Sequence, residues 1–210
     1  MNNAAAFHEN DSLKQAFLDG AGLPADTIGA LTPELMALLG KLLATSMQGT
    51  IDLLALRSLV KQEVKADVTM VVVRNNNPLK FFPDSQTVLT QMLRKKMPGF
   101  MEPFEALDDA WRDLRAHQLG VVAGTRASME AILRRLHPDR IERALPAPSV
   151  FDKLLAARRP AAAWDLYRHK HGRVRGDAID PFTGPLGATF RAAYEKEVEK
   201  ELAEPSREAA

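Results

Sequence analysis

The sequence predicts an all-α fold: a single helical domain built on two long amphipathic helices with shorter helices packed around them. Apolar side chains recur three and four residues apart over residues 33–66 and 103–137, which is the spacing of one face of a helix. A β-branched run at residues 68–73 fits either a short strand or an extension of the preceding helix, and no partner strand is evident elsewhere. We expect the domain to span residues 12–204, with a soft boundary near residue 148.

The two ends of the chain are expected to be irregular. Residues 1–11 are interpreted as a linker or a disordered N-terminus, and they lack the basic and apolar regions of a secretory signal. A short helix is expected at residues 12–19, capped by Ser12 and stopped by the glycines that follow it. Residues 205–210 are expected to form a disordered tail.

The first long helix is expected to run from Pro33 to about Ala66. Thr32 can cap it, proline suits its first position, and Glu34 lies near the positive end of the helix dipole. Its apolar positions are Leu35, Leu38, Leu39, Leu42, Leu43, Met47, Ile51 and Leu54. Charged residues interrupt this stretch before it reaches the length of a membrane span, so it is interpreted as a core helix without direct membrane insertion.

An asparagine-rich turn at residues 74–84 lies between the long helices. Asparagine tolerates left-handed backbone geometry, and the prolines at 78 and 83 fix φ, so this turn should hold one shape. In the favoured interpretation its asparagines satisfy helix ends and its apolar residues fill the core. A second, compatible interpretation is an exposed protein-recognition surface formed by Arg74, Asn76, Asn77 and Lys80.

The second long helix is expected from Pro103 to about His137, after a shorter helix that Asp84 caps and that ends near Lys96. One apolar row contains Phe104, Leu107, Trp111, Leu114, Val121, Met129, Ile132 and Leu136, if Gln118 and Thr125 are allowed into it. A row of small residues, which would let a neighbouring helix approach closely, contains Ala116, Gly120, Ala123, Gly124, Ala127 and Ala131. Two packed faces predict a central helix, the spine of the domain.

Beyond Pro138, which should end the spine, the chain has a different texture. We expect a hinge at residues 146–148, followed by a short helix at 149–157 and a further helix around 164–167. A loop is then expected at 172–187, and a final charged helix at 190–204.

The composition excludes several function classes. The chain has no cysteine, so it forms no disulfide, zinc–thiolate site or thiol nucleophile, and a cytoplasmic location is the default expectation. Its 28 basic and 27 acidic residues nearly cancel, so the whole chain offers no field that would gather nucleic acid. The five histidines lack the spacing of a metal site in a helical bundle, and no glycine-rich phosphate loop is present. We therefore predict no metal, no cofactor and no catalytic residues.

Two polar residues, His117 and Gln118, lie in the middle of the predicted spine. The favoured interpretation is a buried hydrogen-bond network that fixes the register of neighbouring helices, because polar groups at a packed seam need partners. A proton shuttle in a hydrolase is a weaker hypothesis, since no activated nucleophile or paired carboxylate accompanies them.

A basic cluster follows, containing Arg158, Arg159, Arg168, Lys170, Arg173 and Arg175. Trp164 and Tyr167 lie among these charges, so nucleotide or nucleic-acid binding is an alternative function for this region. An acidic face of a protein partner is favoured, because no nucleic-acid reader motif is recognised.

The asparagine-rich turn resembles a segment of the C-terminal domain of FHA-containing accessory proteins of bacterial type VI secretion systems. Further segments similar to that family, in the same order, are residues 17–23, 98–100, 113–118, 164–167 and 192–195. The resemblance implies a non-enzymatic, cytoplasmic docking or scaffold domain. Its implied partners are subunits of the baseplate or membrane complex, with self-association left open. The FHA module that binds phosphothreonine in that family is not recognised in this sequence.

Overall fold

The computed structural model describes residues 2–64, 75–94, 98–148, 157–179 and 184–204. Over these ranges the regular structure is helical, and the extended backbone forms a single isolated bridge between Asn76 and Phe100. The predicted all-α class is therefore confirmed. The β-branched run at 68–73 and the helix expected at 149–157 lie outside the described residues.

Helix α1 spans Asn2–Ala21 and α2 spans Pro33–Val64. The first helix thus begins well before the start expected at Ser12. The second begins where the sequence predicts, and the Thr32 hydroxyl accepts a hydrogen bond from the Leu35 amide at 3.2 Å.

Two short helices follow, α3 over Pro78–Phe81 and α4 over Ser85–Leu93. Asn77 and Asp84 cap them through side-chain oxygens that accept backbone hydrogen bonds. Together with the second half of α2 and the first half of α5, they enclose the main apolar core. Its buried residues are Met47, Ile51, Leu54, Leu79, Val88, Ala110 and Leu114.

The spine of the domain is α5, which spans Pro103–Leu136 and is about 50 Å long at 1.5 Å per residue. Its bounds agree with the prediction from the sequence. The short helix α6, Pro138–Glu142, follows at once, and His137 separates the two.

Helix α8 spans Arg158–Ile179, and α9 spans Pro185–Ala203. The loop expected from residue 172 is therefore wrong for its first part, because α8 continues through Gly172 and Gly176. Each glycine weakens a helix by about 1 kcal/mol relative to alanine. Val174 between them is buried, so tertiary packing overrides the local preference.

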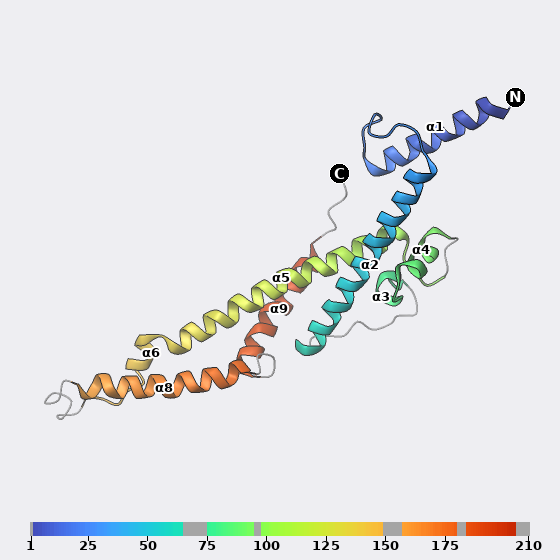
Figure 1. The fold of residues 1–210 in the computed structure, drawn as a ribbon. Helices are drawn as coiled ribbons and strands as arrows, with labels where there is room; N and C mark the ends of the chain where they lie inside the picture. Colours follow the sequence, from blue (N-terminus) through green and yellow to red (C-terminus); the bar gives the residue numbers. More distant parts are fainter. Residues whose placement is uncertain (1, 65–74, 95–97, 149–156, 180–183, 205–210) are drawn as a thin grey trace.

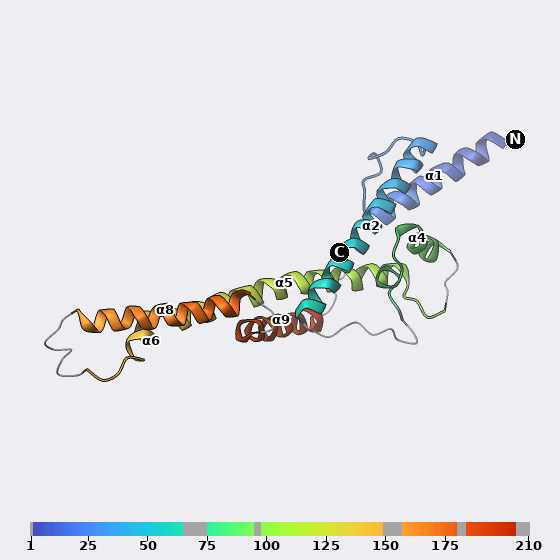
Figure 2. The ribbon, with the colours of Figure 1, turned by 60° about the horizontal axis from the view of Figure 1, so that its bottom comes forward.

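The molecule is elongated (Figure 1). Helices α2, α3 and α4 pack at one end of α5, whereas α6 and α8 lie at its other end. Helix α9 lies along the middle of α5, and this is the most extensive helix pairing among the described residues (Figure 2). Each end of α5 therefore has its own set of packed neighbours.

Candidate docking surfaces and buried polar networks

The asparagine-rich turn is fixed to the start of α5 by backbone and side-chain hydrogen bonds. Asn75 has a positive φ of 64°, and its side chain donates to Glu105 at 3.1 Å. The Asn76 amide donates to the Gly99 carbonyl at 2.8 Å, and the Asn76 carbonyl accepts from the Met101 amide at 3.0 Å. The turn is thus joined to the segment that leads into α5.

Asn77 is 5% exposed, and both the oxygen and the nitrogen of its side-chain amide form hydrogen bonds. Its Oδ1 accepts from the Leu79 amide at 2.9 Å. Its Nδ2 donates to the Ala106 carbonyl and to Asp109 Oδ2, each at 2.7 Å. This amide therefore caps α3 and binds it to α5.

Lys80 also points inward. Its Nζ forms ion pairs with Asp109 Oδ2 at 2.7 Å and with Asp113 Oδ2 at 2.5 Å. The other oxygen of Asp113 lies 3.2 Å from Nη2 of Arg57, so one carboxylate on α5 joins α2 and α3. A buried ion pair is strongly destabilised when one partner is removed, because the remaining charge has lost its compensation.

The recognition surface expected at this turn is therefore only partly available. Asn77 and Lys80 are engaged in internal contacts, Asn76 is half-buried, and Arg74 lies outside the described residues. Phe81 remains exposed and meets Phe82 and Phe100 edge-to-face, with ring centroids 5.1 and 5.4 Å apart. The internal contacts favour a structural role for the turn.

His117 belongs to a second polar network, between α5 and α9. Its Nδ1 lies 2.9 Å from the hydroxyl of Tyr194, and both side chains are buried. Burial raises the pKa of the Tyr194 hydroxyl above its ordinary value. Because both side chains are buried, a substrate has no access to this pair. The geometry therefore does not favour the proton-shuttle hypothesis.

Gln118 does not share that network, because its side chain is exposed, about 100° around α5 from that of His117. The prediction that both polar residues are buried together is wrong for Gln118. One helical residue advances the side chain by about 100°, so adjacent positions cannot both face α9 squarely.

The residues of the basic cluster lie along α8. Arg158 and Arg168 are exposed, Arg159 donates to the Pro146 carbonyl at 3.3 Å, and Lys170 donates to the Arg140 carbonyl at 3.4 Å. Two of the four candidate residues thus hold the α6 region against α8. The exposed Trp164 ring stacks on Tyr167 with centroids 5.4 Å apart.

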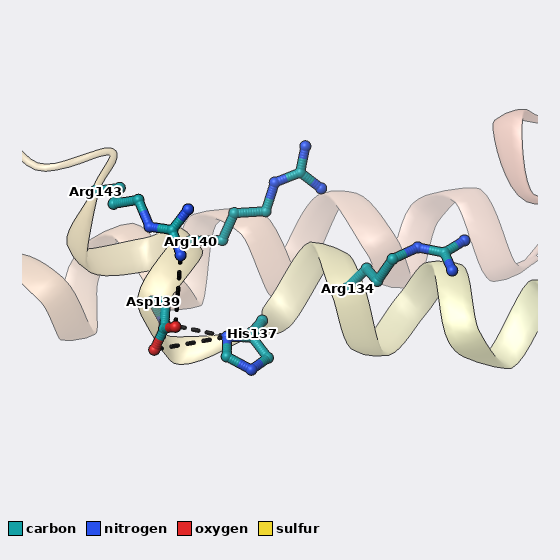
Figure 3. Close-up of a pocket in the computed structure, with 5 residues that line it drawn as sticks. All are labelled: Arg134, His137, Asp139, Arg140 and Arg143. Carbon is teal, nitrogen blue, oxygen red and sulfur yellow. Dashed lines mark hydrogen bonds and ion pairs between the residues drawn. The ribbon is translucent and has the colours of Figure 1, made fainter.

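A hollow of about 510 Å³ lies at the same end, where α5 meets α6 (Figure 3). Its lining consists of Arg134, His137, Asp139, Arg140 and Arg143. Asp139 accepts from Arg143 at 3.5 Å and lies 3.8 Å from His137, while the side chains of Arg134 and Arg140 extend away from it. The three arginines make the lining of the hollow predominantly basic, which suits an acidic ligand group. Within the described part of the chain, no cluster of His, Asp or Glu side chains could hold a metal ion.

Exposed apolar rows mark two of the long helices. On α2 the row consists of Leu38, Leu42, Leu53 and Leu56, which we call the α2 leucine row. On α5 it consists of Phe104, Trp111, Val122, Met129 and Leu133, which we call the α5 outer row. Sequence reasoning placed Leu38, Leu42, Phe104, Trp111 and Met129 in packed faces, and this is wrong for all five. It did not single out Leu53, Leu56, Val122 or Leu133. Their spacing from the other members of each row places them on the same face of the helix, and this spacing could have identified them.

The family model for the C-terminal domain of Type VI secretion system FHA protein matches residues 19–197. The chain belongs to this family. The resemblance seen in the sequence is therefore confirmed, and it covers most of the chain. No curated protein and no solved structure matches it.

As a type VI FHA C-terminal domain, the chain belongs to an accessory protein of the secretion apparatus. Among its described helices, none has the length and apolar character needed to cross a membrane.

Proposed function

We propose that this domain is a non-enzymatic docking scaffold in the cytoplasm, which contacts subunits of the baseplate or of the cytoplasmic part of the membrane complex. In a protein that also has an FHA module, such contacts would support assembly or its regulation by threonine phosphorylation. The observation that supports this proposal most directly is the α2 leucine row.

The α2 leucine row is unusual because α2 is apolar on two opposite sides. Met47 and Leu54 face the core, while the four leucines of the row lie on the other side, each 45% to 58% exposed. The spacings between the four leucines keep them within about 60° around the helix axis. A helix that is apolar all round is normally buried, so an exposed second side favours a partner.

A partner segment of complementary chemistry is an amphipathic helix that offers apolar residues at every third or fourth position. No charged residue of α2 lies within the row itself. Lys41 and Asp52 lie to one side of it, where they can form polar contacts at the rim.

The described groups supply little that favours catalysis. The polar networks at Lys80 and His117 are internal, and the hollow beside α6 is lined by three arginines, a histidine and one aspartate, with no serine, threonine or cysteine among them. These observations support a docking function over a hydrolase.

The test measures binding of the purified domain to individually purified type VI baseplate subunits and to the cytoplasmic parts of membrane-complex subunits. The double variant Leu42→Glu, Leu53→Glu should lower affinity for the true partner at least tenfold, because two carboxylates enter an apolar contact. The matched control Ala37→Glu, Ala55→Glu adds the same charges to another side of α2 and should leave affinity unchanged. Equal effects of the two double variants, or no binding to any subunit, would exclude this docking surface.

The basic end is the second candidate contact, because the stacked Trp164 and Tyr167 lie among exposed arginines. An acidic protein face is favoured as its ligand. Nucleic acid is the alternative. Fluorescence anisotropy with labelled single-stranded DNA decides between them: tight binding that falls steeply with salt supports nucleic acid, and no binding at low salt removes it.

A further inference from the structure

We propose that α8 docks an acidic helix of a partner protein along one exposed row of side chains, which we call the α8 column. Its members are Trp164, Arg168, His171 and Arg175. This inference rests on the docking function proposed above, and it names the partner chemistry of the basic end. Because α8 lies at the other end of α5 from the α2 leucine row, the two contacts can be tested separately (Figure 1).

The four residues of the α8 column lie along one side of the helix. They are separated by 4, 3 and 4 residues, which at about 100° per residue keeps them within about 60° around the helix axis. All four are exposed. By contrast, Val174 is buried and Lys170 reaches the Arg140 carbonyl, so the side of α8 that these two residues occupy faces the rest of the molecule. The column lies on another side, where a partner has access.

The positive charge of the α8 column is not compensated within the chain. Among the residues that the structure describes, neither Arg168 nor Arg175 forms an ion pair or a hydrogen bond through its side chain. Helix α8 contains two carboxylates, and one of them, Asp177, pairs with Arg135 of α5 at 2.7 Å. The other, Asp165, lies about 60° to 120° around the helix from the members of the column. Two uncompensated guanidinium groups favour carboxylates in the partner.

Stacked rings support the two ring-bearing members of the α8 column. The Tyr167 ring stacks on Trp164, with centroids 5.4 Å apart and planes inclined by 18°. It also meets the His171 ring at a centroid distance of 6.0 Å. Trp164 is nevertheless 60% exposed, so part of its surface is free to contact an apolar side chain. The partner should therefore place an apolar residue beside Trp164 and carboxylates farther along the column.

The spacing of the α8 column fits another helix. Arg168 and Arg175 are seven residues apart, or about 10.5 Å along the axis, and carboxylates seven residues apart on a partner helix have the same separation. Small residues flank the column, with Ala161 and Gly172 on one side and Ala178 on the other. A partner helix can therefore approach α8 closely, since the distance between helix axes depends on the side chains at the contact.

A single-stranded nucleic acid fits the same surface less well. Proteins that bind single strands stack successive bases on several aromatic rings, whereas the column offers one exposed indole, because Tyr167 is half-buried beside it. The two arginines on this side of α8 neutralise about two phosphates, which supports only weak electrostatic binding. The observations therefore favour an acidic helix.

Fluorescence anisotropy of the full chain with labelled designed peptides tests the proposal. The matched probe is an alanine-rich helical peptide of about 20 residues, in which one leucine and three glutamates repeat the column's spacing of 4, 3 and 4 residues. It is made in two versions, with the leucine first or last, for parallel and antiparallel docking. A scrambled probe of the same composition distributes these four residues around the helix. One matched version should bind at least tenfold more tightly than the scrambled probe.

Two double variants locate the contact on α8. Arg168→Glu, Arg175→Glu should lower affinity for the matched probe at least tenfold, because carboxylates then face carboxylates. The control Arg140→Glu, Arg173→Glu makes the same change of charge at the same end of the molecule but outside the column, and it should lower affinity much less. All four positions are exposed, so circular dichroism and the melting temperature should match those of the unchanged chain.

The remaining outcomes decide against the α8 column as a helix-docking surface. Equal affinity for the matched and scrambled probes would overturn the proposal, because it would show that net charge alone is recognised. So would tighter binding to single-stranded DNA, or to vesicles of anionic phospholipid, that Arg168→Glu, Arg175→Glu abolishes. Self-association that the same variant abolishes in sedimentation velocity would assign the column to a second copy of the chain instead. The variant Leu42→Glu, Leu53→Glu should bind the matched probe like the unchanged chain, so failure of docking at the α2 leucine row would leave this result intact.

Discussion

At the residue scale, a single buried amide determines how the asparagine-rich turn joins α5. Asn77 accepts a hydrogen bond within α3 and donates two across to α5, so both the oxygen and the nitrogen of its side chain are needed. The sequence predicted a rigid turn and a capping role for asparagine. It did not predict the partners Ala106 and Asp109, because a pattern of local propensities contains no information on contacts about 30 residues apart.

The substitution Asn77→Asp should be severely destabilising, by about 3 kcal/mol or more. It keeps the shape and the acceptor to Leu79, but it replaces the donor beside Asp109 with a second carboxylate in a buried position. Urea denaturation followed by circular dichroism measures the change. The matched control Asn75→Asp, at an exposed position with a positive φ that aspartate tolerates, should lower stability by less than about 1 kcal/mol. Similar losses for both variants would contradict the assigned role of Asn77.

Tyr194 gives a second prediction at this scale, with a defined pH dependence. Its pKa is raised above 10.0 by burial, so the folded state favours the neutral phenol. The contribution of this group is fully present below pH 10 and decreases as pH rises through the folded-state pKa. Tyr194→Phe should cost about 1 kcal/mol near neutral pH through loss of the hydrogen bond to His117.

Between neutral pH and pH above 10, the free energy of unfolding in urea should fall less for Tyr194→Phe than for the unchanged chain. Tyr167→Phe is the matched control, since Tyr167 is half-buried on α8 and stacks on Trp164. The control should keep the steeper pH dependence of the unchanged chain. If Tyr194→Phe kept that dependence as well, the raised pKa would not be the source of it.

At the element scale, α5 shows what the spacing of residues along a helix can and cannot predict. The sequence contains two rows on this helix, one of large apolar residues and one of small residues, and both were predicted. The prediction that both are packed is confirmed for the small row and for Leu107 and Leu114 of the large row, but it is wrong for Phe104, Trp111 and Met129, which are exposed. Large side chains at helical spacing indicate that something covers them, but they do not distinguish the chain's own helices from another molecule.

The close packing of α9 against the small row can be tested with a glycine-to-alanine substitution in the row and the same substitution at a control glycine on α8. Gly120→Ala should destabilise the protein by about 1 to 3 kcal/mol, because the added Cβ would lie 2.8 Å from Cδ2 of Tyr194 and 2.9 Å from Cγ2 of Val198. Gly172→Ala, in the interior of α8 with no atom within 4 Å of the new Cβ, should instead stabilise by about 0.5 to 1 kcal/mol. Thermal and urea unfolding measure both changes. Stabilisation by both substitutions would show that α9 does not pack closely against Gly120.

At the scale of the whole molecule, charge is distributed unevenly although the total is close to zero. Residues 134–179 contain eleven Lys and Arg and five Asp and Glu, while the whole chain has a formal net charge of +1. The remaining residues are therefore acidic overall. The net charge was correctly used to exclude a uniform basic field, but it concealed this polarity. The polarity becomes meaningful because the fold is elongated and places the basic segment at one end (Figure 1).

The arrangement of neighbours along α5 predicts that its two ends unfold separately. Every residue of the main core lies between Met47 and Leu114, and none belongs to α9. By contrast, the middle of α5 depends on α9, which fills the space beside Gly120 and Gly124 and supplies the partner of His117. Removal of α9 should therefore loosen the second half of α5 and leave the core formed with α2, α3 and α4 in place.

A chain that ends after Ile179 tests this prediction by amide hydrogen exchange. Amides of residues 117–128 should lose protection by at least tenfold, whereas those of Ala110, Leu114 and the second half of α2 should retain most of theirs. A chain that ends after Glu204 is the control and should exchange like the full chain, since it keeps the whole of α9. Loss of protection throughout α2, α3 and α4 in the shorter chain would mean that the molecule unfolds as one cooperative unit, with α9 as part of it.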